Sequence, residues 1–362
     1  MKIAIVHDWL VTNAGAEKVL KEIIELYPQA DIYSLVNFLS SNQQKDIVKR
    51  KTIHTSFIQK LPFAKKYFRY YLPLFPKAIE SFKLKDYDII ISSSWAFSKG
   101  IKKNPNQIHI CYCHTPIRYA WDLYDEYTSN LKQPKKLLTQ LTLQYIRKWD
   151  IKTIDNVDFF IANSKFVQER IKRIYNKNAK VIYPPVDIEK FSFCDKKEEY
   201  YLTASRLVPY KKTKLIVEAF NKMPNKKLVV IGDGEELSNI KQIAQKNIII
   251  LGYQKDETLI RYMQKAKAFV YAAVEDFGIL PIEAMACGTP VIALNKGGTA
   301  ETVIDKINGI HFEEQNTISI INAIKQFEKI KFDYQKIRET TYKYTSFKQK
   351  FSKYMESICK KY

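Results

Sequence analysis

Short apolar runs recur along the whole chain, and most are continuous rather than alternating with polar residues. Continuous runs of four to six such residues are typical of parallel strands that are covered on both faces. Helical patterns separate them, so the order predicts doubly wound α/β architecture. Two series are present, at residues 3–6, 32–35, 89–92, 108–113, 159–162 and 180–182, and at residues 201–204, 228–231, 248–251, 268–271 and 291–293.

The two series are separated near Pro184 and Pro185, which are followed by a charged run at residues 195–199. A double proline is a stiff connection, and a charged run is typical of a linker. With 362 residues the chain is long enough for two cores. We therefore predict domains at 1–186 and 187–344, followed by an amphipathic helix at 345–362 with aromatic residues at helical spacing.

The formal net charge is +21, and residues 1–185 hold most of it, with 30 basic against 16 acidic residues. Such an excess favours an anionic partner: nucleic acid, an acidic membrane surface or a phosphate-bearing substrate. No nucleic-acid-binding signature accompanies it, so we predict no nucleic-acid partner.

No run of about 18 apolar residues is present, and the opening strand is too short for a signal peptide, so we expect a cytoplasmic protein. The scattered cysteines have no zinc spacing and are expected to be reduced and buried.

Two glutamates, Glu275 and Glu283, flank the start of a short helix that we expect at residues 284–287. Pro281 is a helix start signal and Gly288 a stop signal. Glu275 then lies on the loop after a strand, where ligands bind in open α/β sheets, and Glu283 is expected to fall inside the helix. Two carboxylates there can accept hydrogen bonds from ribose and hexose hydroxyls. The alternative is an acid on a helix dipole beside an unrelated surface glutamate.

Further candidates follow strands of the second series. Arg206 and Lys211 lie five apart across a turn and can converge on a diphosphate, although solvated surface charge is the usual fate of such residues. Glycines at 232, 234, 297 and 298 follow two other strands, where a tight turn can admit a base or phosphate. A plain turn is the alternative.

In the first series, Gly15 and Ala16 separate a strand from a helix whose amides can face an anion. His114 follows the strand at 108–113, where an imidazole can bond sugar hydroxyls or share a proton. His7 ends the first strand and can face the same region. An ordinary turn and structural histidines are the alternatives.

These motifs together resemble the retaining GT-B glycosyltransferases of family four. The resemblance rests on Glu275 to Glu283 and on three further motifs in the expected order, Ser205 to Lys212, Val230 to Gly234 and Gly297 to Glu301. It implies two Rossmann-like domains facing across a cleft, a C-terminal helix that crosses back to the first domain, and no metal or other cofactor. The implied catalytic residues are His114, Glu275, Arg206 and Lys211. The implied donor-binding residues are Gly15, Ala16, Arg206, Lys211, Gly232, Gly234, Glu275, Phe277, Gly278, Ile279, Glu283 and Gly298.

The segment from His114 to Asp122 resembles bacterial O-antigen and capsule mannosyltransferases. This implies GDP-mannose as the donor and a lipid-linked or growing cell-surface glycan as the acceptor, which His114, Arg118, Tyr119, Trp121 and Asp122 would meet. Another UDP- or GDP-sugar is the alternative within the class. A non-catalytic nucleotide-sugar-binding scaffold of a polysaccharide assembly complex is the alternative outside it.

Residues 59–75 mix cations with aromatic rings, which is typical of a segment at a membrane interface. A helix whose aromatic face packs into the core is the alternative reading. We predict that the chain binds the inner face of the cytoplasmic membrane peripherally. The predicted contacts are Lys60, Lys65, Lys66, Phe68, Arg69 and Tyr71.

Overall fold

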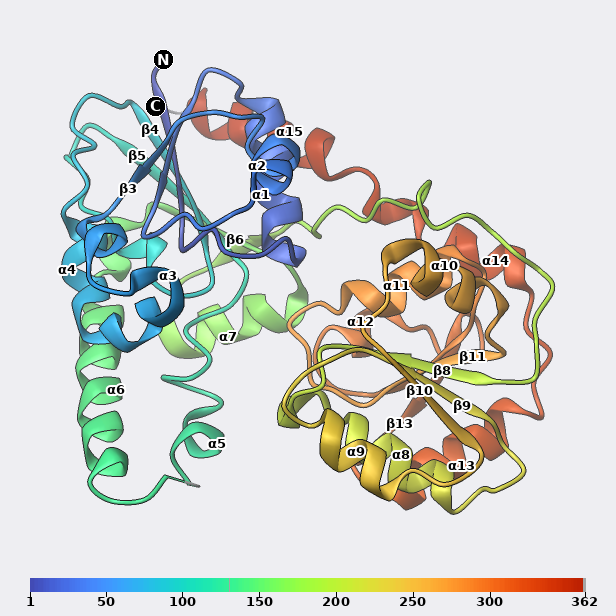
Figure 1. The fold of residues 1–362 in the computed structure, drawn as a ribbon. Coiled ribbons are helices and arrows are strands. Elements are labelled where there is room, and N and C mark those ends of the chain that lie inside the picture. Colours follow the sequence, from blue (N-terminus) through green and yellow to red (C-terminus); the bar gives the residue numbers. More distant parts are fainter. Residues whose placement is uncertain (130, 361–362) are drawn as a thin grey trace. The chain divides into compact units, whose positions relative to one another are not determined.

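The computed structural model describes residues 1–129 and 131–360 and contains two compact units (Figure 1). The N-terminal unit comprises Met1–Pro185 with Phe347–Tyr362, and the C-terminal unit comprises Val186–Ser346. The first boundary falls one residue before the predicted one, and the returning segment begins two residues later than predicted. Positions 361 and 362 of the predicted final helix lie outside the described residues.

The N-terminal unit is built on a seven-stranded sheet in the order β3-β2-β1-β4-β5-β6-β7, and each pair of neighbours is parallel. The prediction of parallel, buried strands is confirmed for the central ones, whose residues are almost all fully enclosed. The strands are β1 Ile3–His7, β2 Asp31–Ser34, β3 Ile53–Thr55, β4 Ile89–Ser94, β5 Ile108–Cys113, β6 Phe159–Ala162 and β7 Ala179–Val181.

Helices cover both faces of this sheet, because alternate strand residues point to opposite sides. Ile3 and Ile5 pack with α1, α2 and α15, whereas Ala4 and Val6 pack with α4 and α6. The last helix, α15, therefore returns to the N-terminal unit and packs beside α1, as expected. The helices are α1 Gly15–Leu26, α2 Ser41–Ile47, α3 Ala64–Tyr67, α4 Phe75–Glu80, α5 Tyr124–Thr128, α6 Lys135–Lys152, α7 Lys165–Tyr175 and α15 Phe347–Cys359, with 3-10 turns η1 Phe57–Lys60, η2 Phe68–Leu74, η3 Ser98–Gly100 and η4 Ile154–Asn156.

The C-terminal unit has a six-stranded parallel sheet in the order β10-β9-β8-β11-β12-β13. Its strands are β8 Tyr201–Ala204, β9 Leu228–Ile231, β10 Ile248–Gly252, β11 Ala268–Tyr271, β12 Val291–Leu294 and β13 Gly309–Phe312. Its helices are α8 Thr213–Asn221, α9 Leu237–Ile243, α10 Asp256–Lys265, α11 Ile279–Ala286, α12 Thr299–Thr302, α13 Thr317–Phe327 and α14 Tyr334–Glu339, with 3-10 turns η5 Pro209–Lys211 and η6 Tyr342–Tyr344.

The strand order reverses once in each sheet, between β1 and β4 and between β8 and β11. At such a point the connections leave toward opposite faces, and a crevice opens beyond the carboxyl ends of the two strands. Ligands of open α/β sheets bind in such a crevice, so the reversal point of each unit is a candidate ligand site. The Rossmann-like prediction is confirmed for both units, and the polar residues at each reversal point define the candidate site.

Candidate active site

At the reversal point of the C-terminal unit, a lysine, a glutamate and a tyrosine come together. Lys211 ends the 3-10 turn after β8 and forms an ion pair with Glu275, which follows β11. Tyr271 ends β11, and its hydroxyl lies 3.1 Å from Glu275 Oε1 and 3.4 Å from Lys211 Nζ. The two charged side chains are 16% and 15% exposed, so the pair is largely shielded from water.

The environment of Lys211 keeps it charged. Burial acts to lower the pKa of Lys211, but Tyr271 and Glu275 beside it outweigh that effect and raise the pKa above its usual value. The ammonium is therefore a fixed positive charge at the carboxyl edge of the sheet. An anion that reached it would meet a group that is already desolvated and oriented.

Arg206 lies in the same β8–α8 connection and is exposed. Its guanidinium makes no hydrogen bond or ion pair with the described residues, so it can contact a ligand without losing a protein partner. Lys212, which precedes α8, has φ of +57°, a left-handed conformation that glycine adopts more readily. The turn therefore has a glycine-like geometry although a lysine occupies it.

Several predicted glycines are required by close approach of the backbone. A Cβ at Gly232 would lie 1.9 Å from the Ser205 carbonyl oxygen, and one at Gly234 would lie 2.3 Å from that of Leu207. A Cβ at Gly298 would lie 2.3 Å from the backbone of Phe277. These glycines hold the ligand-side loops against one another, a packing role that their positions alone did not reveal.

Helix α11 begins at Ile279 rather than near 284, so the predicted start was about one turn late. Gly278 precedes it with φ of +82°, and Gly288 follows it with φ of +76°, as a stop signal should. Glu283 lies inside this helix, as predicted, and is 3% exposed. The helix is otherwise apolar, so an acid at that depth is an unusual choice for packing alone.

At the reversal point of the N-terminal unit, two histidines share one serine. Ser93, near the end of β4, places its Oγ 3.1 Å from His7 Nδ1 and 2.8 Å from His114 Nε2. His7 ends β1, and His114 directly follows β5. Burial, with a smaller effect of His7, lowers the pKa of His114 to about 3, so its imidazole is neutral near pH 7. His114 is where the motif placed it; the connecting Ser93 was not predicted.

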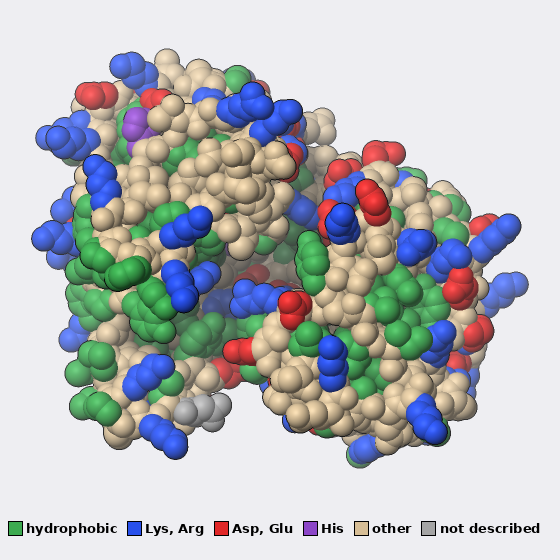
Figure 2. All heavy atoms as spheres, viewed as in Figure 1, with side chains coloured by type: hydrophobic (Ala, Val, Ile, Leu, Met, Phe, Trp, Pro, Cys, Tyr) green, Lys and Arg blue, Asp and Glu red, His purple; other side chains and the backbone are tan. Residues whose placement is uncertain are grey.

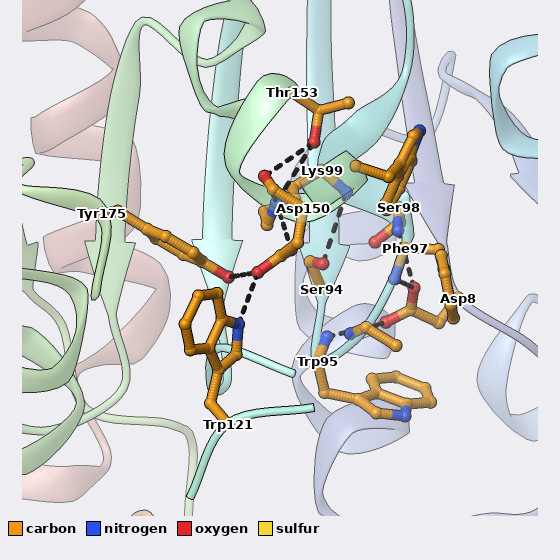
Figure 3. Close-up of polar contacts among 12 residues, drawn as sticks. Asp8, Ser94, Trp95, Phe97, Ser98, Lys99, Trp121, Asp150, Thr153 and Tyr175 are labelled. Atoms are coloured by element: carbon orange, nitrogen blue, oxygen red, sulfur yellow. Dashed lines mark hydrogen bonds and ion pairs between the residues drawn. The ribbon is translucent and has the colours of Figure 1, made fainter. Parts of the chain in front are cut away.

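Asp8, next to His7, fixes the loop that follows β4. Its carboxylate accepts hydrogen bonds from the amides of Trp95, Ala96, Phe97 and Ser98, at 2.6–2.9 Å (Figure 3). Burial raises the pKa of Asp8, and these amide donors act in the opposite direction. Asp8 thus holds in place the loop after β4, in which Trp95 packs against both histidines.

The segment predicted to meet the acceptor is held by polar contacts of its own. Trp121 donates its indole N–H to Asp150 at 2.8 Å (Figure 3), and Asp122 forms ion pairs with Arg170 and Arg173. These side chains anchor the segment to α6 and α7. Arg118 and Tyr119, which precede these two residues in the chain, are half-buried.

The predicted membrane segment divides into buried and exposed parts. Lys60, Lys65, Lys66 and Arg69 are exposed, but Phe68 is 3% exposed and packs with Trp9 and Phe75. Phe68 therefore belongs to the core, and its predicted membrane contact is wrong. Tyr71 is half-buried and donates its hydroxyl to the Pro62 carbonyl. The exposed apolar residues are Phe57, Phe63, Tyr67, Tyr70 and Leu74.

A second exposed apolar stripe lies on α6, which packs against η2. Figure 2 shows hydrophobic side chains gathered on this part of the N-terminal unit. Leu137, Leu138, Leu141 and Tyr145 are each about half exposed or more, and Lys148 and Lys152 continue the same stripe at helical spacing. The stripe gave no clear signal in the sequence, because its exposed apolar positions are mixed with polar ones.

Of the cysteines, Cys111, Cys113 and Cys287 are buried, whereas Cys194 and Cys359 are only partly covered, which corrects the expectation for those two. All are free thiols. Among the described residues, no helix is both long and apolar enough to cross a bilayer.

Two doubly wound parallel units, each with polar groups at its reversal point, define the class of protein that the fold resembles: the GT-B glycosyltransferases. Residues 14–190 match the family described as Glycosyltransferase Family 4, and residues 187–344 match Glycosyl transferases group 1. Together the matches span residues 14–344, so the chain belongs to the family-four glycosyltransferases.

Curated relatives are similar over part of the chain. An uncharacterized glycosyltransferase of Methanocaldococcus jannaschii is 32% identical over 167 residues, which cover 44% of this chain and 47% of that protein. The alpha-1,3/1,6-mannosyltransferase ALG2 of Candida glabrata is 25% identical over 293 residues, covering 64% of this chain and 60% of ALG2. The chain thus spans about half to three fifths of the length of these relatives.

Solved structures match over nearly the whole length. Anabaena HepE in complex with UDP and glucose has a TM-score of 0.68 at 18% identity, covering 98% of this chain and 99% of HepE. Sucrose-phosphate synthase of Thermosynechococcus elongatus has a TM-score of 0.62 at 17% identity, covering 96% and 94%. At these identities the likeness establishes the fold alone.

Proposed function

We propose that this chain is a retaining glycosyltransferase that moves a hexose, mannose from GDP-mannose, onto a lipid-linked or growing cell-surface glycan. The observation that carries the proposal is the shielded Lys211–Glu275 pair at the reversal point of the C-terminal unit. A fixed ammonium suits the leaving diphosphate, and a carboxylate beside it suits the hydroxyls of the transferred sugar. Family membership supports the reaction class.

In this proposal Arg206 adds a second cation to the diphosphate, and Glu283 binds the ribose. The amides near Gly15 and Gly298 supply further donors to the phosphates. His114 and the segment up to Asp122 meet the transferred sugar and the acceptor on the N-terminal unit. With two cations on the leaving group, transfer needs no divalent metal, so EDTA is expected to leave most of the rate.

Mannose is favoured by the ALG2 relatives, whose names describe mannosyltransferases. A UDP-sugar is the second candidate, because Anabaena HepE was solved with UDP-glucose. A screen of nucleotide release across GDP- and UDP-sugars separates the two. Release from no sugar nucleotide, by protein that binds one, would favour the non-catalytic scaffold instead.

The matched variants are Arg206→Ala and Lys246→Ala. Both residues are exposed cations of the C-terminal unit, but Lys246 precedes β10 and therefore lies at the amino edge of the sheet, away from the reversal point. Loss of a charge-assisted contact of about 1.5–3 kcal/mol predicts a roughly ten- to hundredfold slower transfer for Arg206→Ala. Lys246→Ala is expected to match wild type. Equal rates for both variants would refute the assignment of Arg206 to the diphosphate.

We also propose peripheral binding to the anionic inner face of the cytoplasmic membrane. Exposed Lys60, Lys65, Lys66 and Arg69 stand among exposed rings, and each cation near such a surface contributes about 1 kcal/mol. The α6 stripe adds apolar area beside them. Neutralising the four cations to Gln should weaken cosedimentation with anionic vesicles, whereas neutralising Lys241, Lys246, Lys255 and Lys325 of the C-terminal unit should not. If both quadruple variants lost vesicle binding equally, the binding would depend on net charge alone and not on this segment.

A further inference from the structure

A buried line of polar side chains runs from α1 to His114 in the N-terminal unit. Glu17 Oε1 lies 3.8 Å from His7 Nε2, His7 Nδ1 lies 3.1 Å from Ser93 Oγ, and Ser93 Oγ lies 2.8 Å from His114 Nε2. His7 and Ser93 are fully enclosed, and Glu17 is 3% exposed. His114, at 8%, is the most exposed of the four.

The serine hydroxyl has one hydrogen, so it can donate to only one of the two histidines. If it donates to His7 Nδ1, His114 must supply the hydrogen on Nε2. If it donates to His114 Nε2, His7 must supply the hydrogen on Nδ1. The first arrangement leaves His114 Nδ1 with a lone pair, and the second leaves His114 Nδ1 with a hydrogen when both rings are neutral.

Glu17 selects between these arrangements. Its other oxygen, Oε2, accepts the Ala14 amide at the start of α1, which fixes the carboxylate in place. A carboxylate oxygen facing His7 Nε2 favours a hydrogen on that nitrogen and disfavours a lone pair there. In a neutral ring Nδ1 of His7 is then the acceptor, and Ser93 donates to it.

His7 is fully enclosed, and its Nε2 has no hydrogen bond with the described residues, because 3.8 Å is too long for one. The rings packed around the line, Trp95 against both histidines and Tyr112 against His114, carry no charge.

We infer that Glu17, acting through His7 and Ser93, holds His114 in the tautomer whose Nδ1 is a hydrogen-bond acceptor. Nδ1 of His114 has no hydrogen-bond partner among the described residues, and it is not enclosed by protein. The group it takes is therefore a hydrogen-bond donor. If the proposed function holds, on which this step rests, that donor is a hydroxyl of the transferred sugar or of the acceptor. Glu17, His7 and Ser93 are positioning residues that decide the direction of this hydrogen bond.

The direct test is ¹⁵N NMR of protein labelled at its five histidines, with His114 assigned by loss of its signals in His114→Gln. A nitrogen that carries hydrogen and one that does not resonate in separate regions. Wild type is expected to carry hydrogen on His114 Nε2, and Glu17→Gln is expected to move hydrogen to His114 Nδ1, because the glutamine NH2 would face His7 Nε2. Glutamine keeps the bond to the Ala14 amide through its carbonyl while removing the charge. Glu22→Gln, on the same helix, is the matched control and should leave the tautomer unchanged.

Hydrogen on His114 Nδ1 in wild type, or an unchanged tautomer in Glu17→Gln, would overturn the inference. The measurement needs no substrate, so it can succeed even if the proposed function fails. With a working donor, Ser93→Ala is expected to lower kcat/KM about tenfold, the value of one hydrogen bond, and Ser93→Thr to restore it. If Ser93→Ala lost activity and Ser93→Thr did not restore it, the loss would come from altered packing, and the role proposed for the Ser93 hydroxyl would be refuted.

Discussion

The buried ion pair between Lys99 and Asp150 is expected to be the most sensitive polar contact of the N-terminal unit. Lys99 Nζ lies 2.6 Å from Asp150 Oδ1, and the two side chains are 1% and 0% exposed. The other carboxylate oxygen accepts hydrogen bonds from Trp121 at 2.8 Å and Tyr175 at 3.0 Å (Figure 3). Removing one partner leaves a charge enclosed without its counter-charge, which typically costs about 3–5 kcal/mol.

Lys99→Met and Asp150→Asn should each lower the free energy of unfolding by about that amount. The double variant should lose less than the sum of the singles, because no charge is then left unpaired. The amide oxygen that Asp150→Asn introduces can still accept from Trp121 and Tyr175. The expected coupling is about 1–3 kcal/mol.

Tryptophan fluorescence during urea unfolding reports the stability of the N-terminal unit alone. All four tryptophans, Trp9, Trp95, Trp121 and Trp149, belong to the N-terminal unit, so the C-terminal unit contributes no tryptophan signal. The C-terminal unit can then unfold separately without distorting the result. Single variants that lose less than about 1 kcal/mol, or effects that simply add in the double variant, would refute the reasoning.

Three further outcomes are expected. Burial lowers the pKa of His114 to about 3 and of His109 to about 4, both below the usual 6.5, so below pH 6.5 the unfolded chain binds protons that the native unit does not. The free energy of unfolding should be at its full value above about pH 6.5 and fall below it, by up to about 3 kcal/mol per pH unit, and His109→Gln should remove half of that slope in urea titrations. Lys212→Gly should stabilise the C-terminal unit by about 0.5–1 kcal/mol by calorimetry, because glycine relieves the left-handed backbone but adds freedom to the unfolded chain; a loss of stability would mean that the lysine makes a compensating contact. Phe68→Ala should cost about 3–5 kcal/mol by tryptophan fluorescence and Tyr70→Ala, at 76% exposure, less than about 0.5; similar losses would contradict the division of this segment into core and surface.

Most of the fold could be predicted because its central strands are buried on both faces and therefore have continuous apolar sequences. The two strands that were missed lack this property. β3 is a three-residue edge strand that is half-buried at most. β13 begins with Gly309, where a Cβ would lie 2.0 Å from the Val291 carbonyl, so close packing against β12 requires a residue that strand propensity disfavours.

The sites were predictable only in part, and for a topological reason. Lys211 and Glu275 are 64 residues apart, but each follows a strand of the C-terminal sheet, and those strands, β8 and β11, are neighbours at the reversal point. Their meeting follows from the order of the strands. Ser93 gave no such signal, because it is one of three consecutive serines and only the side-chain geometry shows which of them lies between the histidines.

The two reversal points differ in their chemistry. In the C-terminal unit the ligand-side groups are ionic: Lys211 paired with Glu275, and the exposed Arg206. At the reversal point of the N-terminal unit, His114 is neutral, and Ser93 and His7 separate it from the Glu17 carboxylate. Cationic groups suit a diphosphate, whose charge grows as it leaves, whereas an uncharged acceptor such as His114 suits a hydroxyl, as the Glu275 carboxylate also does. The division of labour that we propose between the units therefore rests on charge as much as on the shared fold: the topology gives each unit one crevice, the cations of the C-terminal unit suit the diphosphate, and neutral His114 suits a hydroxyl of the sugar or of the acceptor.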